Sequence, residues 1–217
     1  EVLLDLHSFH TPGDPFALLG PEDNDGPLEP FVHQAAETNL VLHLGPKRFV
    51  EGWMSVYEAG VAARKASNQP SPEHLLKTEF GVGTTEYFRQ KGGYGVTYEC
   101  GYHEEAEAPG RALYAIMQTL KLLGMIEGEP ERPPASFQVL KLVDVVDRLD
   151  QGDELVREFK SFDPMKKGDK IGTRADGTEV RAERDGYIVF PNPAAENFAE
   201  WYRSEERRVG KECRSRW

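Results

Sequence analysis

Two short runs of residues end on side chains that can bind a metal ion or move a proton. They are LLDLHS at residues 3–8 and GVTYECG at residues 95–101. Each run is apolar and rich in β-favouring residues, which is typical of a buried strand. A His and a Glu brought together by two strand ends can hold a metal ion and transfer a proton during hydrolysis. The sequence therefore indicates a metal-dependent hydrolase whose site contains His7 and Glu99.

The neighbours of these two residues refine the hypothesis. Alternate residues of a strand share a face, so Asp5 can lie beside His7 and orient its imidazole. Glu99 ends an apolar strand, where partial burial would raise its pKa towards a value useful in acid–base catalysis. Cys100 points to the opposite face and is expected to be a buried thiol rather than a nucleophile. For His7 or Glu99 taken alone, an ordinary hydrogen-bonding or solvent-facing role is the alternative.

Predicted strands and helices alternate along the chain and would position these residues. Residues 2–7 and 92–100 predict strands, and the Pro-, Gly- and Asp-rich residues 8–30 predict a long surface loop. The clearest helix is predicted at 111–124, and Gly124 is expected to end it. This helix carries one apolar face, formed by Leu113, Ile116, Met117, Leu120 and Leu123. Further helical patterns cover 30–40 and 49–67, a short apolar run covers 40–45, and Ser71-Pro72-Glu73 predicts a helix start.

This order of elements predicts an α/β fold, a mixed sheet flanked by helices, with a small all-β domain at its C-terminal end. Residues 137–146 and 156–162 predict strands, Asp163-Pro164 a turn, and further turn signals follow. We expect an α/β catalytic domain over 1–129, a Pro-rich linker over 130–136 and the β domain over 137–203.

Both ends of the chain look unnatural. Residues 204–217 (SEERRVGKECRSRW) resemble translated vector or adapter sequence, and we expect a non-native tail; a genuine disordered basic tail is the alternative. The chain opens without Met, in the middle of a predicted strand. We therefore expect that a segment preceding Glu1 is missing.

Composition restricts the partners and the compartment. The net charge of −11 argues against nonspecific binding to nucleic acid or to an anionic membrane. One of the two Cys residues, Cys213, lies in the excluded tail, so a disulfide framework is not expected. No run approaches the ~18 apolar residues that a membrane-spanning helix needs. A cytoplasmic protein with a small-molecule partner is predicted, and its oligomeric state is left open.

The two motifs, their order and the β domain after them resemble the succinylglutamate desuccinylase/aspartoacylase family, a branch of the zinc-carboxypeptidase-like enzymes. The resemblance spans residues 2–203 and includes GYIVFPN at 186–192. In that family, zinc is held by an early His-x-x-Glu motif and by the His of a later Asp-x-His strand, and a Glu on a following strand is the general base. The resemblance implies a Zn²⁺ cofactor, His7 as a metal ligand, Asp5 as its neighbouring carboxylate and Glu99 as the catalytic base.

The sequence departs from the family at the first metal motif. No His-x-x-Glu is present, because His33 and Glu37 are four residues apart and His103 is followed directly by Glu104. We interpret the chain as a fragment that begins inside the full protein and is itself inactive, with weak zinc binding. A degenerate homologue without catalytic activity is the alternative.

The resemblance also implies a reaction. We expect an amidohydrolase or deacylase that cleaves the C–N bond of an N-acyl amino acid or a similar small acylated amine, outside peptide bonds. Arg89 lies where related enzymes have an Arg that holds a substrate carboxylate. Asn192-Pro193-Ala194-Ala195 is followed by Glu196 where N-acetyl-aspartate-specific members have a Tyr, which argues against that substrate.

Two further readings stay open. The same fold could bind a small acidic or peptide ligand without catalysis. The β domain could also mediate protein interaction, and an exposed apolar patch on residues 137–190 would favour that reading. His10 and His103 are minor candidates that we expect near the entrance of the site or in solvent.

Overall fold

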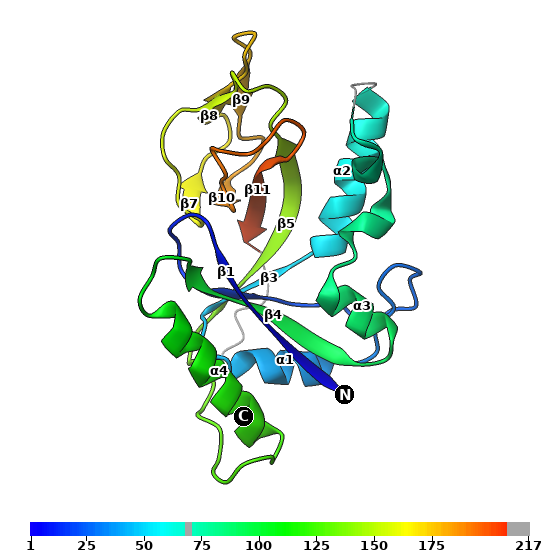
Figure 1. The fold of residues 1–217 in the computed structure, drawn as a ribbon, viewed down its shortest axis with the longest axis vertical. Helices are drawn as coiled ribbons and strands as arrows, with labels where there is room; N and C mark the ends of the chain where they lie inside the picture. Colours follow the sequence, from blue (N-terminus) through cyan, green and yellow to red (C-terminus); the bar gives the residue numbers. More distant parts are fainter. Residues whose placement is uncertain (68–70, 208–217) are drawn as a thin grey trace.

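A mixed eight-stranded sheet forms the centre of the computed structural model, which describes residues 1–67 and 71–207 (Figure 1). Its strand order is β1-β4-β2-β3-β5-β11-β10-β7, and β6, β8 and β9 form a second, three-stranded sheet. The strands are β1 Val2–Phe9, β2 Phe16–Leu18, β3 Arg48–Glu51, β4 Tyr94–Tyr102, β5 Gln138–Asp147, β6 Glu154–Leu155, β7 Asp163–Met165, β8 Lys170–Thr173, β9 Glu179–Arg181, β10 Gly186–Val189 and β11 Glu200–Arg207.

Helices cover both faces of the large sheet. They are α1 Gln34–Leu42, α2 Trp53–Ser67, α3 Thr84–Gln90 and α4 Ala108–Leu122, with 3₁₀ turns η1 Glu73–Leu76 and η2 Thr78–Gly81. Buried residues of α1 and α4 pack in one core with Val96 and Tyr98 of β4. The hydroxyl of Thr85 in α3 lies 2.6 Å from that of Thr97, which points to the opposite face. The predicted fold class, a mixed sheet flanked by helices, is confirmed. Among the described residues, no helix is long and apolar enough to cross a membrane.

The N-terminal half contains a strand that the sequence analysis missed. Residues 8–30 were predicted to be loop, but β2 lies within them, antiparallel to β4 and parallel to β3. Three apolar residues between turns are too few to show a strand periodicity. The helix predicted at 49–67 begins only at Trp53, because β3 occupies 48–51 and Gly52, at φ +92°, turns the chain between the two. Part of the apolar run at 40–45 belongs to α1.

Two predictions in the C-terminal half are wrong. Residues 156–162 form no strand, because Arg157 and the backbone N–H of Lys160 both bind the carboxylate of Asp163 and close a turn. Phe162 ends this turn at φ +73°, outside the β region. Asp163-Pro164, predicted to be a turn, lies in β7 at the edge of the large sheet, where a Pro is tolerated.

The helix start predicted at Ser71 is shifted. The 3₁₀ turn η1 begins at Glu73 after Pro72, and no side chain caps it. A four-residue 3₁₀ turn follows where a longer helix was expected.

The strands predicted for a separate β domain continue the large sheet. β5 pairs in parallel with β3 and antiparallel with β11. Strands from both sides of the predicted linker at 130–136 therefore belong to one sheet. The division into domains stays a prediction. Excluding 204–207 from the fold is wrong, because these residues pair with β5 inside β11. Residues 208–217, with Cys213, lie outside the described residues, and the non-native origin of the tail stays a prediction.

Glu205 in β11 is poorly suited to its position. Its side chain is fully buried, and neither carboxylate oxygen has a hydrogen-bond partner. Burial raises the pKa of Glu205 to about 8, although Arg48 and Arg203 lower it. An unpaired buried carboxylate is costly, and a buried strand position normally carries an apolar residue. At this buried strand position the sequence therefore has a carboxyl group where an apolar side chain would be expected.

Replacing Glu205 with Leu is expected to stabilise the chain. The substitution removes a buried carboxylate without a partner and keeps a similar side-chain size, so we expect a gain of about 2–4 kcal/mol at pH 8. Urea unfolding measures it. The control is Glu206→Leu, which removes a half-exposed carboxylate 3.6 Å from Arg184 and should change stability by less than about 1 kcal/mol. Equal effects of the two substitutions would contradict this account of Glu205.

Candidate functional site

The register between β1 and β4 places His7 beside Glu99. The two strands are parallel, and His7 and Glu99 are Cα partners in the ladder. Paired residues of neighbouring strands point to the same face, so Asp5, His7 and Glu99 share one side of the sheet. The register shifts immediately after His7, which ends the regular pairing at the carboxyl ends of both strands. The two predicted site residues therefore meet at the edge where α/β folds commonly bind ligands.

Asp5 holds the imidazole of His7. The His7 Nε2 lies 3.1 Å from Oδ1 of Asp5, as the alternation of the strand predicted. The side chain of His7 is half exposed, at 50%, so the ring can reach a ligand in solvent. A carboxylate on one ring nitrogen fixes the orientation of the ring and leaves the other nitrogen, here Nδ1, for a metal ion or substrate.

Glu99 is a buried carboxylate with an unused oxygen. The residue is 7% exposed, and Oε2 has no hydrogen-bond partner. Burial raises the pKa of Glu99 from 4.5 to about 7, His7 lowers it, and Asp5 raises it further. A carboxylate with this acidity can exchange a proton at neutral pH, which is what a general base and acid requires.

Aromatic side chains surround the strand partner of Glu99. Phe16 in β2 pairs with Glu99 across the ladder. Its ring centroid lies 5.8 Å from that of Phe9, 5.1 Å from Phe162 and 5.3 Å from Phe190. This aromatic cluster keeps water from one side of the site. The sequence does not predict this cluster, because Phe162 and Phe190 lie in turns with positive φ that no periodic pattern indicates.

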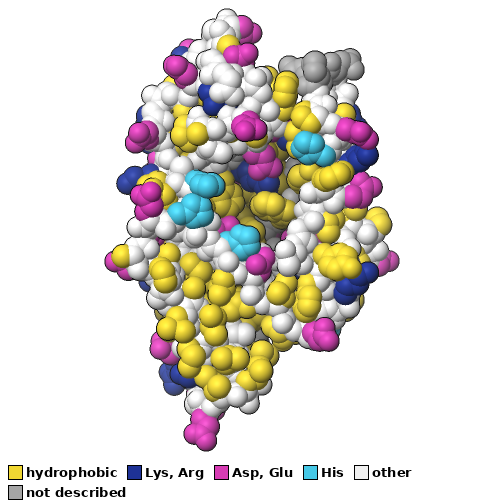
Figure 2. Space-filling view, in the orientation of Figure 1, with side chains coloured by type: hydrophobic (Ala, Val, Ile, Leu, Met, Phe, Trp, Pro, Cys, Tyr) yellow, Lys and Arg dark blue, Asp and Glu magenta, His cyan; other side chains and the backbone are white. Residues whose placement is uncertain are grey.

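Histidines gather near the ends of β1 and β4. The hydroxyl of Ser8 lies 2.7 Å from Nδ1 of His103, and the rings of His10 and His103 meet edge to face at 4.5 Å. Figure 2 shows a hollow at the centre of this face with histidine side chains along its rim. The expected position of His10 and His103 at the entrance stays a prediction.

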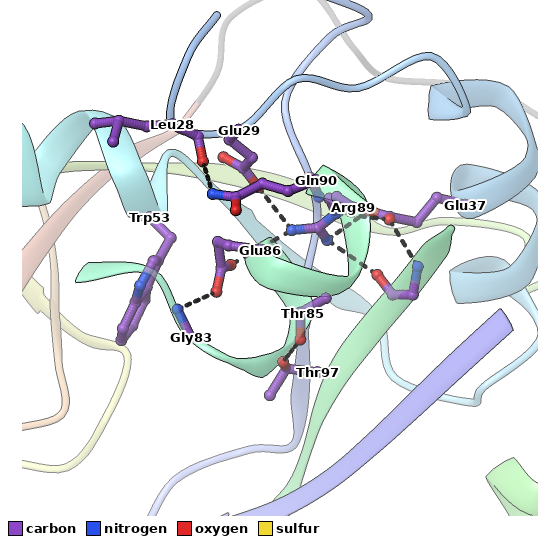
Figure 3. Close-up of polar contacts among 12 residues, drawn as sticks. Leu28, Glu29, Glu37, Trp53, Gly83, Thr85, Glu86, Arg89, Gln90 and Thr97 are labelled. Carbon is purple, nitrogen blue, oxygen red and sulfur yellow. Dashed lines mark hydrogen bonds and ion pairs between the residues drawn. The ribbon is translucent and has the colours of Figure 1, made fainter. Parts of the chain in front are cut away.

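Arg89 lies away from this site, in a buried ion network (Figure 3). Its Nε and Nη2 bind the two carboxylate oxygens of Glu37 at 2.9 and 2.8 Å. Its Nη1 contacts Glu29 at 2.7 Å and Glu86 at 3.4 Å, and Nη2 also donates to the carbonyl of Gly95 at 3.0 Å. These contacts use the five N–H donors of a guanidinium. The role implied for Arg89, holding a substrate carboxylate, therefore has no support in this geometry.

Glu37 is the central acceptor of the network. Its oxygens also accept hydrogen bonds from the backbone N–H of Gly20 at 2.6 Å and of Gly95 at 3.2 Å. The pair of Glu37 and Arg89 thus joins the loop after β2, α1, α3 and the start of β4. Burial raises the pKa of Glu29, the outer acid, to about 7 despite the attraction of Arg89. No sequence pattern predicts this network, because Glu29 and Glu37 lie far from Arg89 along the chain.

Cys100 is a buried thiol, as its place in the strand predicts. It is a free thiol, 3% exposed, in the core on the face opposite Glu99. Burial raises the pKa of this thiol to about 11, so it is protonated at neutral pH. A buried core thiol is therefore confirmed.

The described residues do not form a zinc site by themselves. Within residues 1–67 and 71–207, no group of three or more His, Cys, Asp or Glu could hold a metal ion. Catalytic zinc normally takes three protein ligands and a water molecule. His7 offers one imidazole, so the residues present do not fit zinc without further ligands.

The fold is shared with solved structures. A structure of the ectoine utilization protein EutE (DoeB) from Ruegeria pomeroyi matches 94% of this chain with a TM-score of 0.61 and 20% identity. A succinylglutamate desuccinylase/aspartoacylase from Rhodobacter sphaeroides matches 96% with a TM-score of 0.62 and 14% identity. A succinylglutamate desuccinylase from Vibrio parahaemolyticus matches 94% with a TM-score of 0.56 and 16% identity. No family model and no curated protein matches the sequence.

These matches confirm the predicted resemblance at the level of the fold. Structures of the succinylglutamate desuccinylase/aspartoacylase family match nearly the whole chain. The chain covers 57%, 59% and 53% of the three matched chains, respectively. It therefore spans little more than half the length of these proteins.

Glu99→Gln is expected to change how stability depends on pH. The folded-state pKa of Glu99, about 7, lies above its ordinary value of 4.5, so its favourable contribution is complete below 4.5 and is lost as the pH rises through 7. Gln does not titrate. The stability of E99Q relative to the unsubstituted chain should therefore increase by about 1–3 kcal/mol between pH 5 and pH 8. Urea unfolding at both pH values measures this. The exposed Glu104→Gln is the control, and a pH-independent difference for E99Q would refute the burial argument.

Arg89→Met is expected to destabilise the fold strongly. It leaves the buried carboxylate of Glu37 without its cation, which costs about 3–5 kcal/mol. Arg89→Lys should recover part of the loss, because an ammonium group keeps the charge but not the paired donors. Thermal and urea unfolding measure both. Arg181→Met, which breaks an exposed pair with Glu179, is the control and should cost less than about 1 kcal/mol. A similarly small loss for Arg89→Met would show that the network is no stronger than a surface pair.

Proposed function

We propose that the whole protein to which this chain belongs is a zinc-dependent amidohydrolase. It would cleave the C–N bond of an N-acyl amino acid or a similar small acylated amine, outside peptide bonds. The observation that carries the proposal is the buried carboxylate of Glu99, with an unpartnered oxygen, next to the half-exposed His7 in the ladder of β1 and β4.

Glu99 is the proposed general base and acid. Its free Oε2 would accept a proton from the attacking water, and the same carboxyl would then give that proton to the leaving amine. With a pKa near neutrality, Glu99 can perform both transfers at the same pH. The aromatic cluster beside Phe16 keeps bulk water from this side of the carboxylate and maintains that pKa.

His7 is the proposed metal ligand, and Asp5 orients it. The described part of the chain provides this imidazole but no complete set of zinc ligands. Zinc dependence is therefore proposed for the longer protein and not for this chain alone. This chain covers 57% and 59% of the first two matched structures, which leaves room for further ligands in a longer protein.

The names of the matched structures support the proposed substrate class. Their names describe a desuccinylase, an aspartoacylase and an ectoine utilization protein, all of which fit a small acylated amino acid or amine. Because Arg89 is bound by Glu29 and Glu37, a group other than Arg89 would have to recognise a substrate carboxylate.

A ligand-binding homologue without catalytic activity is the second candidate. It is favoured by the lack of a three-ligand metal group among the described residues. In that case His7 and Glu99 would bind a ligand, and the protein would turn over no acylated substrate.

Measurements on the full-length protein distinguish the enzyme from the ligand-binding homologue. We expect it to contain about one zinc per chain and to release amine from N-acetyl or N-succinyl amino acids. Glu99→Gln should lower kcat by at least about 100-fold with zinc retained, because it removes the proton acceptor. His7→Ala should lower the zinc content measured by elemental analysis. Glu104→Gln and His43→Ala are matched controls that should preserve both properties. Metal-free protein, or unchanged hydrolysis by E99Q, would reject the enzyme.

A further inference from the structure

A β-bulge directly follows Glu99 in β4. Phe9 of β1 pairs with Tyr102, although an unbroken register from Glu99 would pair it with Gly101. One residue of β1 therefore lies opposite two residues of β4, which is the arrangement of a bulge. Bulges near active sites redirect a side chain or end the pairing of two strands. This one lies next to the proposed general base, in the strand that carries it.

Gly101 turns the chain within the bulge. Its φ is +133°, a conformation that residues with a Cβ rarely adopt. A Cβ at this position would also clash with the carboxylate of Glu105 and would lie 2.7 Å from Nη1 of Arg111. The two charged groups therefore approach the backbone of the bulge so closely that only a residue without a side chain fits between them.

Arg111 and Glu105 bind backbone groups on both sides of Gly101. Nη1 of Arg111 donates to the carbonyl of Cys100 at 3.1 Å, and Oε2 of Glu105 accepts from the N–H of Tyr102 at 3.4 Å. The two side chains also bind each other, because Nη2 of Arg111 lies 2.7 Å from Oε1 of Glu105. A bulge interrupts the ladder locally, so backbone groups there depend on partners outside the strand pair. The ion pair supplies two such partners.

Strand pairing resumes beyond the bulge. The N–H of His103 donates to the carbonyl of Phe9 at 2.9 Å, and the hydroxyl of Ser8 lies 2.7 Å from Nδ1 of His103. Contacts with β1 therefore hold β4 on both sides of the bulge, at His7 and at Phe9. The bulge is a defined kink within the pairing and not a frayed strand end.

Helix α4 fixes the position of Arg111. This residue lies in the first turn of the helix, which follows β4 after a short loop (Figure 1). Ala108 and Ala115 of α4 pack in one core with Tyr98, on the face of β4 opposite Glu99. Arg111 therefore contacts the bulge from the side away from the candidate site, where it would touch no substrate.

We propose that Arg111 and Glu105 are positioning residues: their ion pair holds the bulge in β4 and thereby keeps the carboxylate of Glu99 directed at the reacting group beside His7. The proposal rests on the proposed function, in which Glu99 accepts the proton. A misplacement of about 1 Å can lower a rate by about 100-fold. Loss of the ion pair should therefore slow the chemical step and leave substrate binding nearly unchanged.

Arg111→Met in the full-length protein tests this role. We expect kcat for N-acetyl or N-succinyl amino acids to fall by about 10- to 100-fold and KM to change by less than about twofold, because the base is misplaced while the substrate contacts remain. Arg111→Lys should recover part of the loss, because an ammonium group can still donate to the carbonyl of Cys100. Arg184→Met, which breaks an exposed pair with Glu206, is the matched control and should leave kcat unchanged. An unchanged kcat for Arg111→Met in an active enzyme would overturn the proposal.

Hydrogen exchange of the same full-length variants tests the bulge independently of hydrolysis. In Arg111→Met, we expect peptides covering residues 99–104 to exchange at least about tenfold faster, because the bulge loses its partners. Residues 186–189 in β10 should not change, and the melting temperature should stay within about 4 °C, because the ion pair is partly exposed.

The outcomes of the exchange experiment separate this proposal from the proposed function. Faster exchange at residues 99–104 in a protein that hydrolyses no acylated amine would support the role of the ion pair in the bulge and reject the enzyme. Unchanged exchange there would overturn the proposal whether or not the protein is active. Faster exchange over the whole chain with a lower melting temperature would also overturn it, because the ion pair would then stabilise the fold in general and not the bulge.

Gly101→Ala tests the bulge from the backbone. The new Cβ would displace Arg111 and Glu105, so kcat and the exchange at residues 99–104 should change as they do in Arg111→Met. Gly168→Ala is the control, because Gly168 also has a positive φ, +89°, and no atom of the described residues lies within 4 Å of the added Cβ. It should leave kcat unchanged. Full activity of Gly101→Ala with normal exchange would overturn the proposal.

Discussion

The register of β4 within the sheet is the constraint on which the site depends. A slip of one residue would turn Glu99 to the other face and bring Cys100 opposite His7. The network around Arg89 opposes such a slip at the start of the strand, because Glu37 accepts from the N–H of Gly95 and Arg89 donates to its carbonyl. The ion pair at the start of β4 therefore helps to set which side chain of this strand faces the candidate site.

The buried carboxylates of Glu37, Glu99 and Glu205 differ in how the cost of desolvation is compensated. Glu37 is paired with Arg89 and with backbone N–H groups, so its charge is compensated inside the protein. Glu99 keeps one oxygen unpaired and has a pKa near neutrality, which is useful for proton transfer. Glu205 is also unpaired, but it lies in a strand without neighbours that suggest chemistry. Burial alone does not identify a candidate catalytic acid, and of these three carboxylates Glu99 is the one that pairs with a histidine in the ladder.

Features that depend on a local sequence pattern could be predicted, whereas features that depend on contacts between distant residues could not. The runs around His7 and Glu99 were long enough to predict two strands and their shared edge, and the alternation of the strand placed Asp5 beside His7. Strand β2 has three residues and no detectable period, and the turn before Asp163 depends on side-chain contacts that composition does not reveal. The substrate-binding role of Arg89 was implied by the family resemblance, but its position is determined by Glu29 and Glu37, which lie far away in the sequence.

The aromatic cluster beside Glu99 draws its members from both halves of the chain. Phe9 and Phe16 come from the N-terminal strands, whereas Phe162 and Phe190 come from the C-terminal turns. If the C-terminal strands were detached, water would reach Phe16 and the carboxylate beside it, and the pKa of Glu99 would fall towards its ordinary value. The acidity of the Glu99 side chain thus depends on contacts between the N-terminal and C-terminal halves of the chain.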